Sequence, residues 1–282
     1  MNTELLIDRV GDLRSPPQSV SRLLELLPRA DVDSDEIVGI IERDCVLTAK
    51  LLALCNSAAF GFASEISSVG QAVLQLGSRE VGRLVLSLSF GSRLAKPLPG
   101  YAIGGRELLV HSVLTGKLAE QIIPHCAVEF EPSVAYTAGL LHDIGKAVLE
   151  QALDEPTQAR IRRLIEGEAM PRLEAERAVL SCDHAELGRA LLGRWRIPEA
   201  IVEAVGNHHA PPLEQGPRLS CLIHLANCLA HEIGSAPGWD GYAMRVQEPA
   251  AAALGFDADA ADRLLILAHE TLRKVEELTP SP

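Results

Sequence analysis

The sequence predicts an all-α protein, and three observations favour this fold class. Leu, Ala, Glu and Arg recur at helical spacing along the chain. Aromatic residues make up only 4% of it, and the alternating Val- and Ile-rich segments typical of strands are missing. Hydrophobic residues make up 47% of the 282 residues, which is enough for one large domain or two small ones, each with a buried core.

The first hundred residues are divided into short helices by proline, glycine and capping residues. Asp33 followed by Glu36, and Ser68 followed by Gln71, have the three-residue spacing of capping pairs that begin helices. Pro28 and Gly77 mark helix ends. The expected helices run from Val20 to Leu27, from Asp33 to Ile41, from Cys45 to Ser57, from Ser68 to Gly77 and from Val81 to Phe90.

The helix at 81–90 is apolar on nearly all sides, which is typical of a helix buried between two parts of a molecule. Soon after it, Lys96-Pro-Leu-Pro-Gly100 and Gly104-Gly105 indicate a short connector. We therefore expect an N-terminal helical subdomain over residues 1–100 and a second helical subdomain over residues 101–282.

The second subdomain contains longer helices. Asp183 is placed to cap one of them and Pro198 to open the next. Charged residues are dense between 155 and 180, and that stretch is expected to be a solvated surface that includes Glu176. The expected helices run from Glu107 to Gln121, from Pro132 to Leu153, through 155–180, from His184 to Trp195, from Pro198 to His209, from Leu219 to Ile233 and from Asp259 to Leu278.

Charge and composition exclude several classes of protein. The formal net charge is -12, so the basic face of a direct nucleic-acid binder is not expected. No run of eighteen apolar residues occurs, and the N-terminus lacks the pattern of a secretory signal. The six cysteines form no CxxC pair and are expected to be reduced and buried. These features predict a soluble, cytoplasmic protein that does not enter a membrane.

The segment Gly139–Leu149 places two metal-capable side chains, His142 and Asp143, within an apolar stretch read as one continuous helix. Adjacent helical residues lie about 100° apart, close enough to share one ion. Gly145 allows another backbone or a ligand to approach, and Lys146 is one turn beyond His142. A buried histidine satisfied by its neighbouring carboxylate would give the same pair of residues.

Other histidines and one glutamate extend this pair into a candidate metal centre. Imidazole together with carboxylate suits iron, manganese, zinc or nickel, and helical bundles build such centres from inward-facing side chains of several helices. One or two divalent ions would fit, and two ions could bind a phosphodiester and activate water. Taken alone, each of these histidines is more often structural: His111 and His184 suit core positions, and His208-His209 before a double proline suits a helix end. The candidate ligands are Glu107, His111, His142, Asp143, His184, His208 and His209.

Several motifs in order resemble the HDOD domain, a relative of the HD superfamily of metal-dependent phosphohydrolases. The resemblance covers roughly residues 13 to 235 and implies an all-helical fold with a role in bacterial signalling. Many HDOD domains lack metal ligands and act as binding modules, whereas the related HD-GYP enzymes hydrolyse cyclic diguanylate. The motifs are Ile40–Leu52 with Cys55-Asn-Ser57, Ile66–Gly77, Gly139–Lys146, His184–Gly188, Trp195–Pro198 and His208-His209.

The resemblance assigns the HD-GYP ligand pattern to the same seven residues and to Lys146, with two departures. The closing aspartate corresponds to Asn227, a neutral and weaker donor. The GYP loop is replaced by Ala210–Gly216, so recognition of cyclic diguanylate is not implied.

Two functions remain open at this stage. The favoured one is a non-catalytic signal-transduction module that binds a signalling protein or a nucleotide-type small ligand. The alternative is a metal-dependent phosphohydrolase in which Asp143 and Lys146 act as catalytic groups. Asn227 and the missing loop favour the module. The sequence leaves the oligomeric state open.

Overall fold

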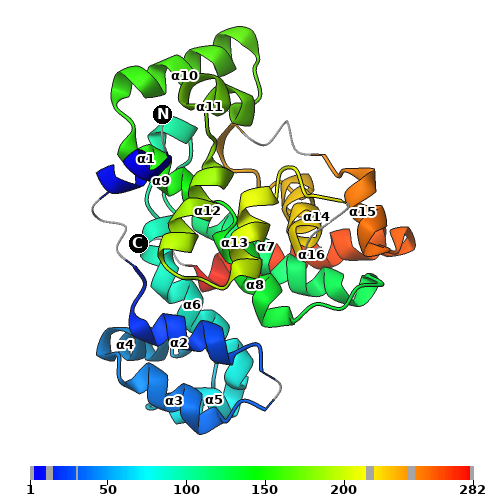
Figure 1. The fold of residues 1–282 in the computed structure, drawn as a ribbon. Coiled ribbons are helices and arrows are strands. Elements are labelled where there is room, and N and C mark those ends of the chain that lie inside the picture. The colour runs from blue at the N-terminus through cyan, green and yellow to red at the C-terminus, as the bar shows by residue number, and fades with distance from the viewer. Residues whose placement is uncertain (1–2, 11–14, 30, 214–218, 240–244, 280–282) are drawn as a thin grey trace.

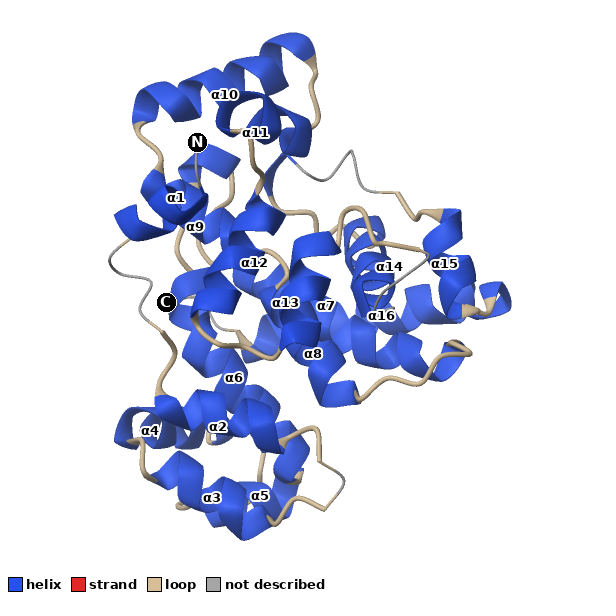
Figure 2. Cartoon of the chain, in the orientation of Figure 1, coloured by secondary structure: helices blue, strands red, loops and turns tan. Residues whose placement is uncertain are grey.

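The structure is a computed structural model that describes residues 3–10, 15–29, 31–213, 219–239 and 245–279. Within those ranges the regular structure is helical, apart from an isolated bridge between Leu98 and Ile103 (Figure 2). The predicted all-α fold class is confirmed.

A small bundle of four helices forms one end of the molecule, at the bottom of Figure 1. Its helix starts follow the predicted caps: Asp33 accepts a hydrogen bond from the Asp35 amide, and the Ser68 hydroxyl accepts one from the Gln71 amide. The Gln71 side chain in turn accepts from the Ser67 amide. The bundle consists of α2 (Gln18–Leu26), α3 (Ser34–Glu42), α4 (Cys45–Cys55) and α5 (Val69–Leu76).

Helix α6 (Ser78–Leu94) joins this bundle to the rest of the molecule. It packs on α2–α5 and also on the α7–α9 region. Val81, Leu86 and Phe90 are fully buried along it, and the Phe90 ring stacks on Trp195 with centroids 6.2 Å apart. The predicted burial of this helix between two parts of the molecule is confirmed.

In the larger part of the molecule, a group of central helices pack together and further helices lie outside them (Figure 1). Helix α1 (Thr3–Arg9) also packs here, on α9 and α12, where Arg194 pairs with Glu4 and Asp8. The central helices are α7 (Glu107–Ile122), α8 (Pro132–Leu141), α9 (Ile144–Ala152), α12 (His184–Arg194), α13 (Glu199–Asn207) and α14 (Leu219–Glu232). The outer ones are α10 (Glu155–Glu168), α11 (Arg172–Leu180), α15 (Glu248–Leu254) and α16 (Ala261–Leu278).

The single helix expected from Pro132 to Leu153 was wrong, because the chain breaks between α8 and α9 at His142 and Asp143. The His142 side chain bonds to the carbonyl of Gly139, the group that a continuous helix would pair with the amide of residue 143. Because of this break, His142 and Asp143 are not consecutive residues of one regular helix. Both side chains lie in the interior of the molecule.

The connector after α6 is a packed segment. Its 3-10 turn η1 (Pro99–Tyr101) lies between Leu98 and Ile103, which pair with each other. The Gly100 amide donates to Glu150 and its carbonyl accepts from Arg172. Tyr101 is only 2% exposed. The connector therefore has a fixed position against the larger part of the molecule.

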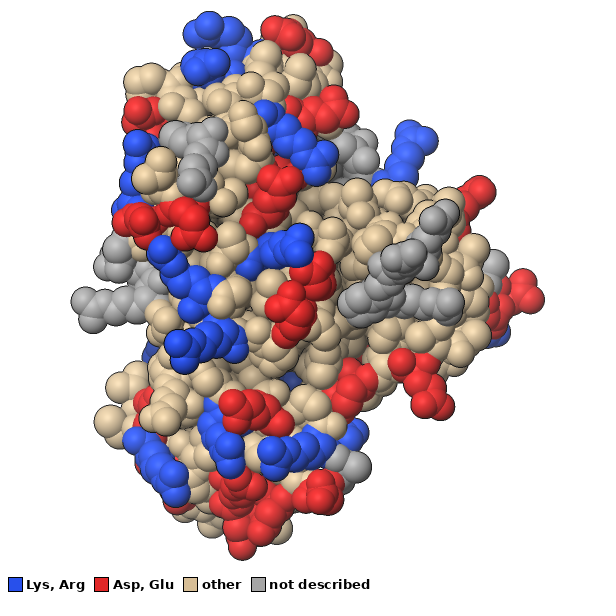
Figure 3. Space-filling view, in the orientation of Figure 1, with Lys and Arg blue, Asp and Glu red and all other residues tan. Residues whose placement is uncertain are grey.

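The surface carries mixed charge. On the face drawn in Figure 3, Lys and Arg side chains are interspersed with Asp and Glu side chains. Among the described residues, no helix combines the length and apolarity needed to cross a bilayer.

Candidate metal centre

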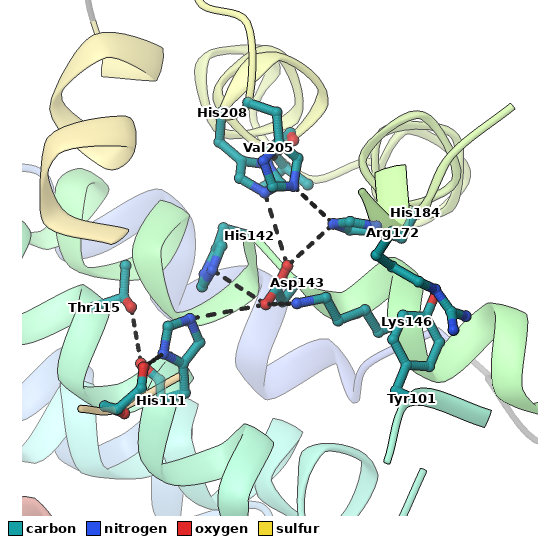
Figure 4. Close-up of polar contacts among 12 residues, drawn as sticks. Tyr101, His111, Thr115, His142, Asp143, Lys146, Arg172, His184, Val205 and His208 are labelled. Carbon is teal, nitrogen blue, oxygen red and sulfur yellow. Dashed lines mark hydrogen bonds and ion pairs between the residues drawn. The ribbon is translucent and has the colours of Figure 1, made fainter. Parts of the chain in front are cut away.

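Five of the seven sequence-predicted ligands lie around a sixth, Asp143, and Lys146 contacts the same carboxylate. Figure 4 shows Asp143 with Lys146 and four of these histidines, His111, His142, His184 and His208. Two groups of side chains share the Asp143 carboxylate, and within each group the ligand atoms lie within 4.8 Å of one another. One group is His111, His142 and Asp143; the other is Asp143, His184, His208 and His209.

The two oxygens of Asp143 face different histidines. Oδ2 lies 3.4 Å from His142 Nε2 and 3.8 Å from His111 Nε2. Oδ1 lies 3.4 Å from His184 Nε2 and 3.7 Å from His208 Nε2. These separations are too long for good hydrogen bonds. They suit donors that surround a common ion at about 2 Å each, because such donors lie roughly 3 Å or more from one another.

Several of these atoms have no hydrogen-bond partner although they are buried. They are the Nε2 atoms of His111, His142 and His208 and the Oδ1 atom of Asp143. Buried polar atoms are normally paired, so such a cluster is suited to hold a bound group. Imidazole nitrogens around a carboxylate are the donor set of divalent transition metals. The residues present therefore fit a metal centre in which Asp143 lies between two ion positions.

Each of four histidines is oriented through its other ring nitrogen. The Nδ1 atoms of His111, His142 and His208 lie 2.7–2.8 Å from backbone carbonyls of Ser235, Gly139 and Val205. His184 Nδ1 lies 2.8 Å from the Glu176 carboxylate. An oxygen acceptor requires the proton on Nδ1, so in the neutral ring the Nε2 lone pair is directed at the centre. The ligand tautomers are thus fixed by the surrounding fold.

Glu176 was expected on a solvated surface, and this expectation was wrong. Its side chain is fully buried and accepts hydrogen bonds from His184, Arg172 and Tyr101. Burial would raise the pKa of Glu176, but His184 and Arg172 lower it to about 2. Burial would likewise lower the pKa of His184, whereas Glu176 raises it to about 10. Without an ion its Nε2 therefore also carries a proton, which a bound metal would displace. The i,i+4 pair of Arg172 and Glu176 was the available signal, but surface helices show the same pattern.

Lys146 and His209 complete the centre. Lys146 Nζ donates to Asp143 Oδ2 at 2.6 Å and is 1% exposed. His209 Nε2 lies 2.8 Å from His184 Nε2, a distance at which two ring nitrogens need a proton or a cation between them. Burial lowers the pKa of His209 well below its usual range. Its neutral form is a metal donor.

Two close helix contacts bring the ligands together. A side chain at Gly139 would meet the backbone of Gly116 at 2.6 Å, so α8 lies directly on α7. A side chain at Gly145 would meet the His184 carbonyl at 1.8 Å, so α9 lies directly on α12. The prediction that Gly145 admits another backbone is confirmed, and that backbone carries a candidate ligand.

The structure does not bring Glu107 into this cluster. Its carboxylate is exposed and accepts a hydrogen bond from the Gly104 amide at 3.1 Å. Instead, His231 on α14 lies against His111, with ring centroids 5.0 Å apart. Asn227, one turn before His231, is buried and its Oδ1 has no hydrogen-bond partner. The i,i+4 spacing of Asn227 and His231 was visible in the sequence, but this pair of residues matches no metal-binding motif.

Five of the six candidate ligands are enclosed by the protein. His111, His142, Asp143, His184 and His208 are each at most 1% exposed. The Tyr101 ring from the connector stands edge-on to His184, with centroids 6.5 Å apart. His209 is the partly exposed member of the six candidate ligands.

Comparison with known proteins matches residues 13–211 to the HDOD domain. The chain is 29% identical over 214 residues to an uncharacterized protein of Treponema pallidum, covering 73% of this chain and 39% of that protein. It is 30% identical over 136 residues to ribonuclease Y of Desulfotalea psychrophila, covering 48% of this chain and 19% of the enzyme. The chain therefore spans well under half the length of both relatives.

A solved structure shares the fold. It is an HDOD domain protein of unknown function from Geobacter sulfurreducens, with a TM-score of 0.77 and 23% identity. The match covers 98% of this chain and 97% of that one. At this identity the likeness establishes the fold.

Proposed function

The chain belongs to the HDOD domain family, whose model it matches over residues 13–211, and on this premise we propose that it is a cytoplasmic bacterial signal-transduction module. It acts by binding a partner protein or a nucleotide-type ligand. Its metal centre holds one or two divalent ions (iron, manganese, zinc or nickel) that stabilise or sense and do not catalyse.

The observation that carries this proposal is the burial of most of the donor set. Four of the donor atoms, on His111, His142, Asp143 and His208, are unpaired. These residues and His184 are at most 1% exposed, and His209 is half-buried. Structural metal sites are closed by protein, whereas catalytic sites keep a position open for water or substrate. Asn227 supports the same reading, because it offers a neutral donor where a further carboxylate would add charge.

The residues that would hold the metal come from separate helices. His111 and His142 with Asp143 form one position, and Asp143 with His184, His208 and His209 forms the other. A divalent ion bound there supplies Lewis-acid and water-activating chemistry in phosphohydrolases. In this chain the same ligands join α7, α9, α12 and α13, so occupancy would stabilise the packing of those helices.

Metal content tests the proposal. We expect purified wild-type protein to carry roughly one or two ions per chain, and the His208→Ala/His209→Ala double variant to lose most of them. His269→Ala is the matched control, because His269 is exposed on α16. Elemental analysis by mass spectrometry is the measurement. If the wild type and the double variant carry equally little metal, the metal centre is ruled out.

The alternative function is that of a metal-dependent phosphohydrolase. The donor set favours it, and so does the similarity to ribonuclease Y over 48% of this chain. Asp143 would then hold the ions and Lys146 would steady the phosphate. Assays with cyclic diguanylate and a short RNA, with added manganese or iron, separate the two functions. We expect no turnover; hydrolysis that disappears in His142→Ala would overturn the module.

A further inference from the structure

We propose that Glu176 is the positioning residue of the metal centre and that it links His184 to the connector between the two parts of the chain. The inference rests on the proposed metal centre. It adds a residue that touches no candidate ion position and acts only through a ligand.

One oxygen of Glu176 holds His184 at two points. Oε2 accepts from the His184 backbone amide at 2.9 Å and lies 2.8 Å from its Nδ1. A contact to both the backbone and the ring of one residue fixes the position of the ring. It also keeps the proton on Nδ1, so that Nε2 faces Asp143 Oδ1 at 3.4 Å.

The other oxygen of Glu176 holds the connector. Oε1 accepts from the Tyr101 hydroxyl at 2.6 Å and from Arg172 Nε at 2.8 Å. Arg172 also donates through Nη1 to the Gly100 carbonyl at 2.6 Å, and its guanidinium lies 3.7 Å from the Tyr101 ring centroid. A single buried carboxylate therefore joins the connector to a candidate ligand.

His184 differs from the other oriented histidines in this respect. His111, His142 and His208 are oriented by neutral backbone carbonyls, whereas His184 is oriented by a carboxylate. A carboxylate partner raises the basicity of a ligating imidazole, and its loss typically weakens metal binding by 10- to 100-fold. A buried ion pair alone would be weak evidence of a role. Glu176, however, also contacts the candidate ligand His184, and this contact indicates a positioning role.

The first experiment titrates metal-free protein with Zn²⁺ and Co²⁺. We expect Glu176→Gln to bind both ions about 10- to 100-fold more weakly than wild type, and to alter the visible absorption of the Co²⁺ complex because one ligand has moved. Asp183→Asn is the matched control. Asp183 is also fully buried and paired with an arginine, Arg177, and asparagine retains its helix cap. Its affinity should stay within about threefold of wild type.

The second experiment addresses the connector. Tyr101→Phe removes one hydroxyl that donates to Glu176, and we expect about a two- to fivefold loss of Zn²⁺ affinity in the wild-type background. In the Glu176→Gln background the same change should have little effect, because the shared contact is already weakened. If Glu176→Gln does not fold, Tyr101→Phe still tests the link through its affinity and its Co²⁺ spectrum.

Three outcomes would contradict the inference or a part of it. Unchanged affinity and Co²⁺ spectrum in Glu176→Gln, with only a lower melting temperature, would reduce Glu176 to a structural ion pair and overturn the inference. Unchanged binding in Tyr101→Phe would remove the link to the connector. A wild-type protein that binds neither ion would overturn the metal centre of the proposed function together with this inference.

Discussion

The carboxylate of Asp143 is shared by two groups of candidate metal ligands. Burial would raise the pKa of Asp143, but His142 and Lys146 hold it well below its usual range. The carboxylate therefore stays ionised without solvent. Lys146 Nζ, at 2.6 Å, provides a positive charge beside the Asp143 carboxylate, as a bound cation would. The groups that keep Asp143 ionised therefore also keep it in the form that binds a cation.

The resemblance to HD-GYP enzymes places Asn227 where an aspartate is expected, and Asn227→Asp tests whether this difference affects metal binding. The added carboxylate should tighten Zn²⁺ binding by roughly tenfold or more, because residue 227 is buried one turn before His231, whose ring contacts the candidate ligand His111. In metal-free protein the same charge is buried, so we expect a loss of stability of about 3 kcal/mol. Calorimetric titration and thermal melts with and without Zn²⁺ measure both effects.

Gln151→Glu provides the control for this substitution, because it adds the same charge at an exposed position of α9. Its affinity and stability should stay close to wild type. Equal Zn²⁺ affinity in Asn227→Asp and wild type would show that residue 227 lies outside the centre.

Among the helices, the contact of α9 with α12 decides whether the ligands meet. Gly145→Ala would place a methyl group 1.8 Å from the His184 carbonyl, so the helices must separate. We expect a stability loss of about 3 kcal/mol or more and a loss of metal binding, measured by urea unfolding and Zn²⁺ titration. Gly167→Ala on α10 meets nothing within 4 Å and should be neutral or slightly stabilising. A well-folded Gly145→Ala protein with wild-type metal affinity would contradict the packing.

A second cluster of charges joins α6 to α7. Glu80 and Glu120 share Arg83, and Lys117 pairs with Glu80. Tyr136 of α8 lies beside them, bonded through its hydroxyl to Ser87. Burial raises the pKa of Glu120 to about 7, against the opposing effects of Arg83 and Lys117. This carboxyl therefore titrates near neutral pH at the helix junction.

The sign of the resulting pH dependence follows from the raised pKa of Glu120. Between about pH 4.5 and pH 7 the unfolded chain releases the proton of Glu120 while the folded protein keeps it, so folding becomes less favourable as pH rises. We expect wild type to lose about 2 kcal/mol between pH 5 and pH 8 relative to Glu120→Gln. Urea unfolding at both pH values is the measurement. Glu174→Gln, an exposed change on α11, should follow wild type; a Glu120→Gln variant that does so too would refute the assignment.

At the scale of the whole molecule, α6 belongs to both parts. It packs on the N-terminal bundle and also on α7, α8 and α9, while α1 packs on α9 and α12. A cut at residue 100, the boundary expected from the sequence, would therefore expose apolar surface on the larger part.

We accordingly expect the fragment 101–282 to unfold without a sharp transition and to bind a hydrophobic dye. The fragment 78–282, which keeps α6, should be more stable, and the full chain more stable still, because each retains more buried apolar area. Thermal unfolding and dye binding compare the three. Full-chain stability in fragment 101–282 would show that the two parts are independent.

The sequence alone determined the fold class, most helix bounds and most residues of the candidate site. Caps such as Asp33 and Ser68 are local, because the side chain and the amide that it accepts from lie within three residues. The histidines around Asp143 were identified by residue type and motif. Local spacing and side-chain chemistry require no knowledge of distant contacts.

Only the tertiary structure decided which side chains face the centre. It broke the expected helix at His142 and Asp143, left Glu107 exposed, and brought Glu176 and His231 to the ligands. Each of these outcomes depends on how distant helices pack: α11 against the connector, α14 against α7, and α9 against α12. Helical periodicity gives the face on which a residue lies, but the partner of that face is set by contacts between segments far apart in the chain.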